Sequence, residues 1–176
     1  HDNDDVRSGI NSGSQIVCYY GHGEENNWQA WSIKHYPVIL YWTASDISNL
    51  DHVARAPILF SLSCLNNHLE GCINAYWTSS IRRKAASAAL GASNLLWEGA
   101  EDYGISLFKG VGDNLYTIDL GGVHNAAVAE MLSINQTIEA KANAKTLLLL
   151  GDPAMEVWTR TPAKFTVKND FNGGGG

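Results

Sequence analysis

The chain has little charge, few cysteines and no long apolar run, and each shortage excludes a class of protein. Asp, Glu, Lys and Arg make up 17% of its 176 residues, against a usual share of about 25%. Acidic residues outnumber basic ones by 18 to 12, and the densest basic run is residues 82–84. Because nucleic-acid binding needs clustered Lys and Arg, we expect no nucleic-acid partner. No apolar stretch approaches the roughly 20 residues of a membrane-spanning helix, so we expect no transmembrane segment.

Three cysteines, Cys18, Cys64 and Cys72, are too few for a disulfide framework. At most one pair can form, so at least one thiol stays free. A free thiol is either a small buried hydrophobic group or a reactive one. The histidines show no i, i+4 pair and no neighbouring Cys-x-x-Cys, and we therefore expect no zinc site.

Apolar runs alternate with helical patterns along the body of the chain. Continuous apolar runs, typical of strands covered on both faces, occupy residues 15–20, 57–63, 87–96 and 145–150. Apolar residues at helical spacing occupy residues 69–84, 103–115 and 123–142. This alternation predicts an α/β fold, a three-layer domain with a mostly parallel sheet.

The composition of the ends predicts the domain boundaries. Residues 1–13 are the predicted N-terminal segment, and its first five residues, which are polar and acidic, are expected to be a loose end. Residues 14–160 form the predicted domain. Residues 161–176 end in four glycines and are expected to be the start of a following domain or a flexible tail. Because the chain starts at His1 without a Met or a signal peptide, we expect a processed product or a fragment.

A histidine and a cysteine follow two of the expected strands. His22 follows residues 15–20 after the single residue Gly21, and Cys64 comes directly after residues 57–63. The carboxyl ends of neighbouring parallel strands meet at one edge of a sheet, where a thiol and its general base could come together. The backbone N–H groups of Gly23 and Cys64 could then bind a developing oxyanion. A helix beginning just after Cys64 would also favour the thiolate.

Each of these features has a simpler explanation on its own. A single cysteine at a strand end is usually a buried hydrophobic residue, and Gly-His-Gly usually marks a turn. Their pairing, each after an apolar strand, favours the catalytic interpretation. His68 is a rival base, but a residue on a helix after Cys64 would face away from the first strand. We therefore prefer His22.

Three segments of the sequence carry distinctive motifs: residues 21–28 (GHGEENNW), residues 62–67 (LSCLNN) and residues 150–155 (LGDPAM). They resemble the His motif, the Cys motif and the segment that closes the catalytic domain in the gingipain-type cysteine peptidases, peptidase family C25 of clan CD, a caspase-like group. Asn67 stands where the family usually has Gly. Residues 156–167 resemble the passage into a following immunoglobulin-like domain. The resemblance implies a caspase-like three-layer α/β/α sandwich, corresponding to the second catalytic subdomain.

The resemblance also implies a role for each matching residue. Cys64 corresponds to the nucleophile and His22 to the base, and the backbone of Gly23 and Cys64 corresponds to the oxyanion donors. Trp97 corresponds to a tryptophan that walls the pocket for the residue before the scissile bond; otherwise it is a core or surface aromatic. Cys18 and Cys72 are expected to be buried thiols.

These correspondences imply a secreted or cell-surface cysteine endopeptidase that cleaves protein or peptide substrates through a thioester intermediate. A basic residue before the scissile bond, as in gingipains, is compatible with the acidic chain. No cofactor is required, although calcium is often bound in the family. The acid that orients the histidine and the acid of the specificity pocket usually come from upstream. The expected partner is therefore the upstream subdomain of the same precursor.

Two other functions stay open. A sortase-like transpeptidase of the same family would pass the acyl group to an amine instead of water. A chain that lacks its upstream subdomain could also be a non-catalytic structural module of a cell-surface assembly. The intact pair of Cys64 and His22 favours an enzyme, and the sequence preceding His1 would discriminate these functions best.

Overall fold

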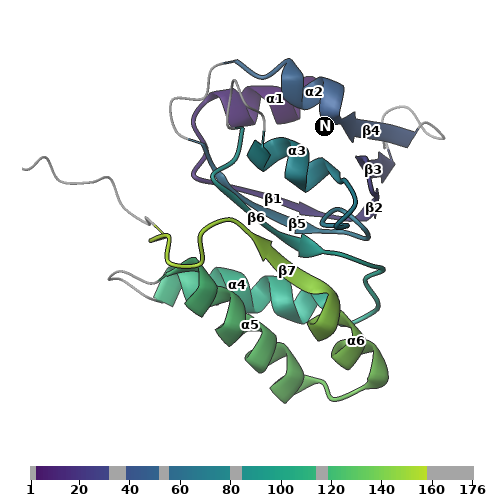
Figure 1. Cartoon of the computed structure of the whole chain (residues 1–176), viewed down its shortest axis with the longest axis vertical. Helices are drawn as coiled ribbons and strands as arrows, with labels where there is room; N and C mark the ends of the chain where they lie inside the picture. Colours follow the sequence, from purple (N-terminus) through teal and green to yellow (C-terminus); the bar gives the residue numbers. More distant parts are fainter. Residues whose placement is uncertain (1–2, 32–38, 52–55, 80–84, 114–118, 158–176) are drawn as a thin grey trace, which may run out of the picture.

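The computed structural model describes residues 3–31, 39–51, 56–79, 85–113 and 119–157. Its centre is a four-stranded sheet with the strand order β1-β5-β6-β7 (Figure 1). The strands are β1 (Ile16–Tyr20), β5 (Ile58–Leu62), β6 (Ala88–Ala92) and β7 (Leu147–Leu150). The first three are parallel, and β7 pairs with β6 in the antiparallel direction. The predicted α/β fold with a mostly parallel sheet is confirmed.

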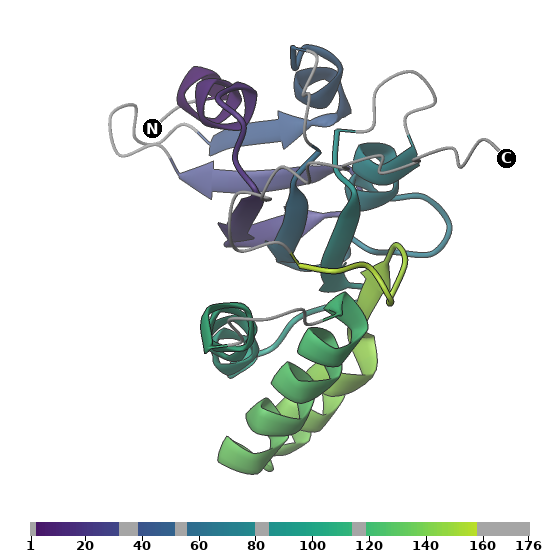
Figure 2. The same ribbon diagram turned by 90° about the vertical axis from the view of Figure 1, so that its left-hand side faces the viewer.

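Helices cover both faces of this sheet and give three layers (Figure 1). One outer layer contains α1 (Asn3–Asn11), α2 (Ala44–Ser48) and α3 (Ile73–Ser79). The other contains α4 (Ala100–Asp113), α5 (Leu120–Ile134) and α6 (Ile138–Thr146). Figure 2 shows this second group, drawn in green, below the sheet and the first group on its opposite side. None of the described helices is long and apolar enough to cross a membrane.

The two middle strands are buried on both faces, which explains their continuous apolar sequences. Every residue of β5 and of β6 is buried. Because successive strand residues point to opposite faces, Phe60 joins the apolar cluster formed with α4 and α5, whereas Leu59 joins the cluster on the α3 side. The sheet thus supports two separate cores.

A second, antiparallel sheet follows β1 and was not predicted. It consists of β2 (His22–Glu24), β3 (Asn27–Trp31) and β4 (Ile39–Thr43). Buried indoles attach it to the α3 side of the domain. The rings of Trp28 and Trp77 stack with their centroids 5.7 Å apart, and those of Trp42 and Trp77 with theirs 6.2 Å apart. Such large aromatic contacts bury much apolar surface.

Three expectations about helices are corrected. Residues 123–142 form two helices, because the chain breaks at 135–137 and Thr137 caps α6 by accepting a hydrogen bond from the backbone N–H of Ala140 at 3.2 Å. The helix predicted over 69–84 begins only at Ile73, and residues 80–84 lie outside the described ranges. The expectation that residues 1–5 form a loose end is wrong from Asn3 onward, where α1 begins. The prediction for residues 161–176 also lies outside the described part of the chain, and the domain boundaries stay predictions.

Candidate functional site

His22 lies on β2, the first strand of a short hairpin whose backbone is fixed by Tyr19. The Tyr19 hydroxyl lies 2.7 Å from the carbonyl oxygen of His22 and 2.6 Å from that of Gln29, and it can donate to either. His22 and Gln29 pair across the hairpin. Gly21 leaves room for this hydroxyl, since a Cβ there would lie 2.6 Å from Tyr19 Oη. Burial raises the pKa of Tyr19, so the phenol stays protonated at neutral pH.

Cys64 lies in a turn that follows β5, and no helix begins there. A helix there would have favoured the thiolate, but α3 starts only at Ile73 and gives Cys64 no such support. The next residue, Leu65, has a φ of 63°, in a region that a leucine rarely adopts. The turn is held in this conformation by the neighbouring loop after β6, where the backbone N–H of Leu65 donates to the carbonyl of Asn94 at 3.1 Å. Such backbone strain clusters at functional sites.

The Cys64 thiol is half-buried and contacts the backbone of Leu96. Its Sγ accepts a hydrogen bond from the Leu96 N–H at 3.3 Å and lies 3.8 Å from the Leu96 carbonyl oxygen. The N–H group would stabilise negative charge on the sulfur, because hydrogen bonds to an ionised acceptor are strong. While the group is a thiol, its S–H can donate a hydrogen bond to this carbonyl oxygen.

The predicted nucleophile and base line the same cavity, which has a volume of about 360 Å³. Trp97 also lines it and is 51% exposed, so its indole is available to a ligand. The lining residues are Tyr20, Gly21, His22, Leu62, Cys64, Leu96, Trp97, Glu98, Ala100 and Glu101. The structure thus brings three of the four predicted site residues to one cavity, and their roles stay predictions.

Gly23, the fourth predicted site residue, does not line this cavity. It lies where the hairpin contacts the turn that contains the cysteine. A Cβ at Gly23 would lie 2.8 Å from Ser63 Cβ and 3.0 Å from Asn66 Nδ2. Only glycine allows this close approach. The proposed oxyanion role of its N–H group is untested.

The loop that carries Trp97 is fixed by a buried amide on α6. Asn143 is fully buried, accepts a hydrogen bond from the Trp97 N–H at 2.8 Å, and donates to the Trp97 carbonyl at 3.1 Å. This pair of hydrogen bonds holds the main chain of the cavity wall and leaves the indole free. The sequence placed Asn143 in a helical pattern but gave no sign of this contact.

Asn67, which stands where the resemblance leads one to expect glycine, has a structural explanation. Its side chain is fully buried and donates hydrogen bonds to the carbonyls of Gly91 at 3.2 Å and Leu148 at 2.9 Å. It also accepts from Asn74 Nδ2 at 2.6 Å. The amide therefore joins the turn after the cysteine to β6 and β7.

Two carboxylates of the cavity were missed by the sequence analysis. Glu98 and Glu101 both line it, although the acid of the pocket was expected only from an upstream segment. The signal that could have found them is their place in the sequence, one and four residues after Trp97. Glu101 is held by a hydrogen bond of 3.1 Å from the Gly99 N–H. Within the described residues, no hydrogen bond joins the His22 ring to a carboxylate.

The other candidate groups lie away from the cavity. His68 Nδ1 is 3.9 Å from Glu25 Oε1, and His68 is not a lining residue. Among the described ranges, no group of three or more His, Cys, Asp or Glu side chains could hold a metal ion. The prediction of bound calcium stays untested.

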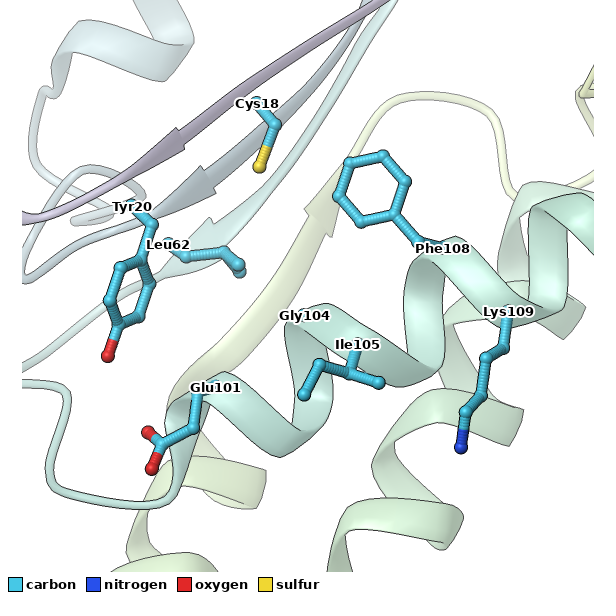
Figure 3. A pocket seen from close by; sticks show the side chains of 8 residues that line it. All are labelled: Cys18, Tyr20, Leu62, Glu101, Gly104, Ile105, Phe108 and Lys109. Carbon is cyan, nitrogen blue, oxygen red and sulfur yellow. The ribbon is translucent and has the colours of Figure 1, made fainter.

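The two remaining cysteines differ from each other. Cys72 is buried as expected, and its burial raises the pKa of the thiol. The expectation that Cys18 is buried is wrong, because its strand lies at the open edge of the sheet and the residue is exposed. Its Sγ nevertheless points into an apolar groove beside α4 (Figure 3), and this partial burial raises the pKa of Cys18.

A profile of peptidase family C25 matches residues 1–158. The chain belongs to peptidase family C25. This is a family of cysteine peptidases, which agrees with the resemblance of the three sequence motifs. No curated protein matches the chain.

Solved structures show the same fold at low sequence identity. The chain superposes on the complex of the pro- and mature domains of RgpB from Porphyromonas gingivalis with a TM-score of 0.78 and 16% identity, covering 92% of this chain and 38% of that one. It superposes on the Arg-specific cysteine proteinase gingipain R with a TM-score of 0.72 and 17% identity, with the same coverage. The chain therefore spans 38% of the length of these two matched chains.

The three thiols should react at different rates in the native protein. Burial raises the pKa values of Cys18 and Cys72, so their thiolates form only at higher pH, whereas Cys64 has an N–H donor and an open cavity. We expect iodoacetamide at pH 7 to label Cys64 first, as measured by peptide mapping over time. Protein unfolded in urea is the control and should label all three alike. Preferential labelling of Cys18 or Cys72 in the native protein would contradict the assignment.

Proposed function

We propose that the chain is the catalytic part of a secreted or cell-surface cysteine endopeptidase that hydrolyses peptide bonds with Cys64 and His22. The observation that carries this proposal is that both side chains line one cavity at the carboxyl ends of paired parallel strands. Membership of family C25 supports the same reaction. Protein or peptide chains are the proposed substrates.

The reaction begins when the Cys64 thiolate attacks the scissile carbonyl carbon and the C=O electron pair moves to the oxygen. In this mechanism, the backbone N–H groups of Cys64 and Gly23 receive the oxyanion. Collapse of the intermediate breaks the C–N bond, and the His22 imidazolium gives its proton to the leaving amine. A thioester remains on Cys64. His22 then takes a proton from water, whose oxygen attacks the thioester and releases the acid and the thiolate.

Removing either member of this pair should abolish turnover while the fold persists. Cys64→Ala removes the nucleophile, and His22→Ala removes proton transfer, which is worth roughly 10²- to 10⁴-fold. Fluorogenic peptides with Arg, Lys, Asp or Asn before the scissile bond measure kcat/KM. Cys18→Ser is the matched control and should keep the activity, since Cys18 does not line this cavity.

Two results would change the proposal. Full hydrolysis by Cys64→Ala would exclude the mechanism. Transfer of the acyl group to an added amine, in preference to water, would indicate the transpeptidase that uses the same thioester.

The composition of the cavity supports a basic residue before the scissile bond. Glu98 and Glu101 supply negative charge, and the exposed indole of Trp97 lines the same cavity. A guanidinium or ammonium group interacts favourably both with carboxylates and with an aromatic face. We propose that these three residues form the pocket for an Arg or Lys side chain.

The charge of Glu101 should therefore decide the preference for basic substrates. Glu101→Gln keeps an acceptor for the Gly99 N–H but removes the charge. We expect kcat/KM for an Arg substrate to fall about tenfold, the equivalent of one charged hydrogen bond. The exposed Glu139→Gln on α6 is the control and should have no effect. Equal losses for Arg and for uncharged substrates would contradict the role of the charge.

The upstream subdomain is the proposed partner, and the structure offers a surface for it. A groove of about 590 Å³ lies between β1 and α4 (Figure 3). It includes the exposed apolar side chains of Tyr20, Ile105 and Phe108. In the described part of the chain no strand pairs with β1 on the side away from β5. The chain spans only 38% of the matched structures, so we propose that a preceding segment adds a strand to β1 and fills the groove.

This partner would also reach the functional cavity. Tyr20, Leu62 and Glu101 line both the groove and the cavity, so a segment seated in the groove would adjoin the cavity that His22 lines. We propose that it brings the carboxylate that orients the imidazole. An unpaired strand edge can pair with another strand, and a large apolar patch marks an interaction site.

Hydrogen exchange can test this docking surface. In protein that includes the preceding segment, the β1 amides that face away from β5 should exchange at least about tenfold more slowly than in residues 1–176 alone, because each becomes hydrogen-bonded. The β5 amides, already in the middle of the sheet, are the control and should change less. Equal β1 exchange in the two proteins, with full activity of the shorter one, would contradict the proposal.

A further inference from the structure

Asn66 lies two residues after the cysteine, and every hydrogen-bonding group of its side chain is used. The residue is fully buried. Its Nδ2 donates to the carbonyl oxygens of Glu24 at 2.5 Å and Asn27 at 3.2 Å. Its Oδ1 accepts from Ser61 Oγ at 2.9 Å and also from the Ser63 hydroxyl. A side-chain amide can make no more than two donor and two acceptor bonds of this kind.

The partners of this amide lie on two different parts of the site. Glu24 and Asn27 flank the turn of the β2–β3 hairpin and pair with each other across it, and His22 lies on the same hairpin. Ser61 lies on β5, and Ser63 is the residue just before Cys64. A single carboxamide thus joins the segment that carries the histidine to the segment that carries the cysteine.

Further contacts show that the hairpin lies directly on this turn. The indole N–H of Trp28 donates to Ser61 Oγ at 2.8 Å, so β3 reaches the same hydroxyl that bonds to Asn66. The Cβ-free Gly23 lies against Ser63 and Asn66. A buried network whose members are all satisfied specifies one arrangement, because any shift leaves polar groups without partners.

We propose that Asn66 is the positioning residue of the site, holding the β2–β3 hairpin, and with it His22, in place against Cys64. This inference rests on the proposed function, since it assigns Asn66 a role in the pairing of base and nucleophile. Asn66 itself does not line the cavity, so it acts through the backbone of the hairpin and makes no contact with substrate.

The next residue provides a matched control. Asn67 is also an asparagine, is also fully buried, and also donates two hydrogen bonds to carbonyl oxygens. Its acceptors, however, belong to β6 and β7 and not to the hairpin. A substitution of the same kind at Asn67 therefore costs the fold similar contacts while it leaves the hairpin anchored.

The test compares Asn66→Asp with Asn67→Asp in the full-length protein. An aspartate carboxylate has the shape of the amide but cannot donate to the carbonyls of Glu24 and Asn27. Two quantities are measured: the pH midpoint of Cys64 alkylation by iodoacetamide, and the hydrogen-exchange rate of the β2–β3 amides. A thiolate paired with an imidazolium gives a midpoint well below the ordinary value of about 8.5. The stability of each variant is measured separately by urea unfolding.

We expect Asn66→Asp to move the midpoint to about 8.5, the value of an unpaired thiol, and to speed exchange in the hairpin. Asn67→Asp should keep the wild-type midpoint and hairpin exchange even where it lowers stability. Ser63→Ala removes one donor to Asn66 Oδ1 and should give a smaller shift in the same direction. If Asn66→Asp does not fold, Ser63→Ala becomes the test. A shifted midpoint in Ser63→Ala then supports the proposal, and an unchanged midpoint overturns it.

The proposal is overturned if folded Asn66→Asp keeps the wild-type alkylation midpoint and the wild-type hairpin exchange rate. It is also overturned if Asn67→Asp shifts the midpoint as much as Asn66→Asp does. Failure of the proposed function would be seen in the wild-type protein instead. If the wild-type midpoint is itself about 8.5, Cys64 and His22 are not paired. Hairpin exchange then still tests Asn66: acceleration in Asn66→Asp alone supports the anchor, and unchanged exchange overturns it.

Discussion

The site depends on the parallel pairing of β1 with β5. Tyr20 lies opposite Leu62 in this register, and the backbone N–H of Gly21 continues the pairing by donating to the Leu62 carbonyl at 3.3 Å. The two strands therefore end at the same edge of the sheet. His22 follows one strand and Cys64 the other, so residues 42 positions apart in the sequence reach one cavity. A one-residue slip in this register would turn every β1 side chain to the other face.

Buried amides and hydroxyls, more than charges, arrange the segments around this edge. Asn66 joins the turn after the cysteine to the hairpin, Asn67 joins it to β6 and β7, and Asn143 holds the loop of Trp97. Neutral hydrogen bonds suit a buried position because they avoid the desolvation cost of ions. The carboxylates that line the cavity, Glu98 and Glu101, are both exposed and so stay free to meet a charged ligand.

The strands of the central sheet could be predicted from the sequence because burial on both faces gives a continuous apolar run. Residues 57–63 contain β5, and residues 145–150 contain β7. The same pattern placed His22 and Cys64 after neighbouring strands. It could not reveal the β2–β4 sheet, whose short strands gain their stability from indoles distant in sequence, such as Trp28 and Trp77. Nor could it reveal the hydrogen bonds of Asn143 to the loop of Trp97, because an amide on a helix becomes part of a site only through the packing of that helix.

A crystal structure of the trapped enzyme would show whether Cys64 and His22 act as one catalytic pair. A peptide aldehyde with Arg at its reactive end forms a hemithioacetal with an active-site thiol. In a crystal structure of the full-length protein with this inhibitor, we expect a bond to Cys64 Sγ and the His22 ring within about 3.5 Å of the adduct. The inhibitor's Arg side chain should lie beside Trp97 and Glu101. An adduct on another residue, or a His22 ring more than about 8 Å from Cys64 Sγ, would show that the two residues are not a catalytic pair.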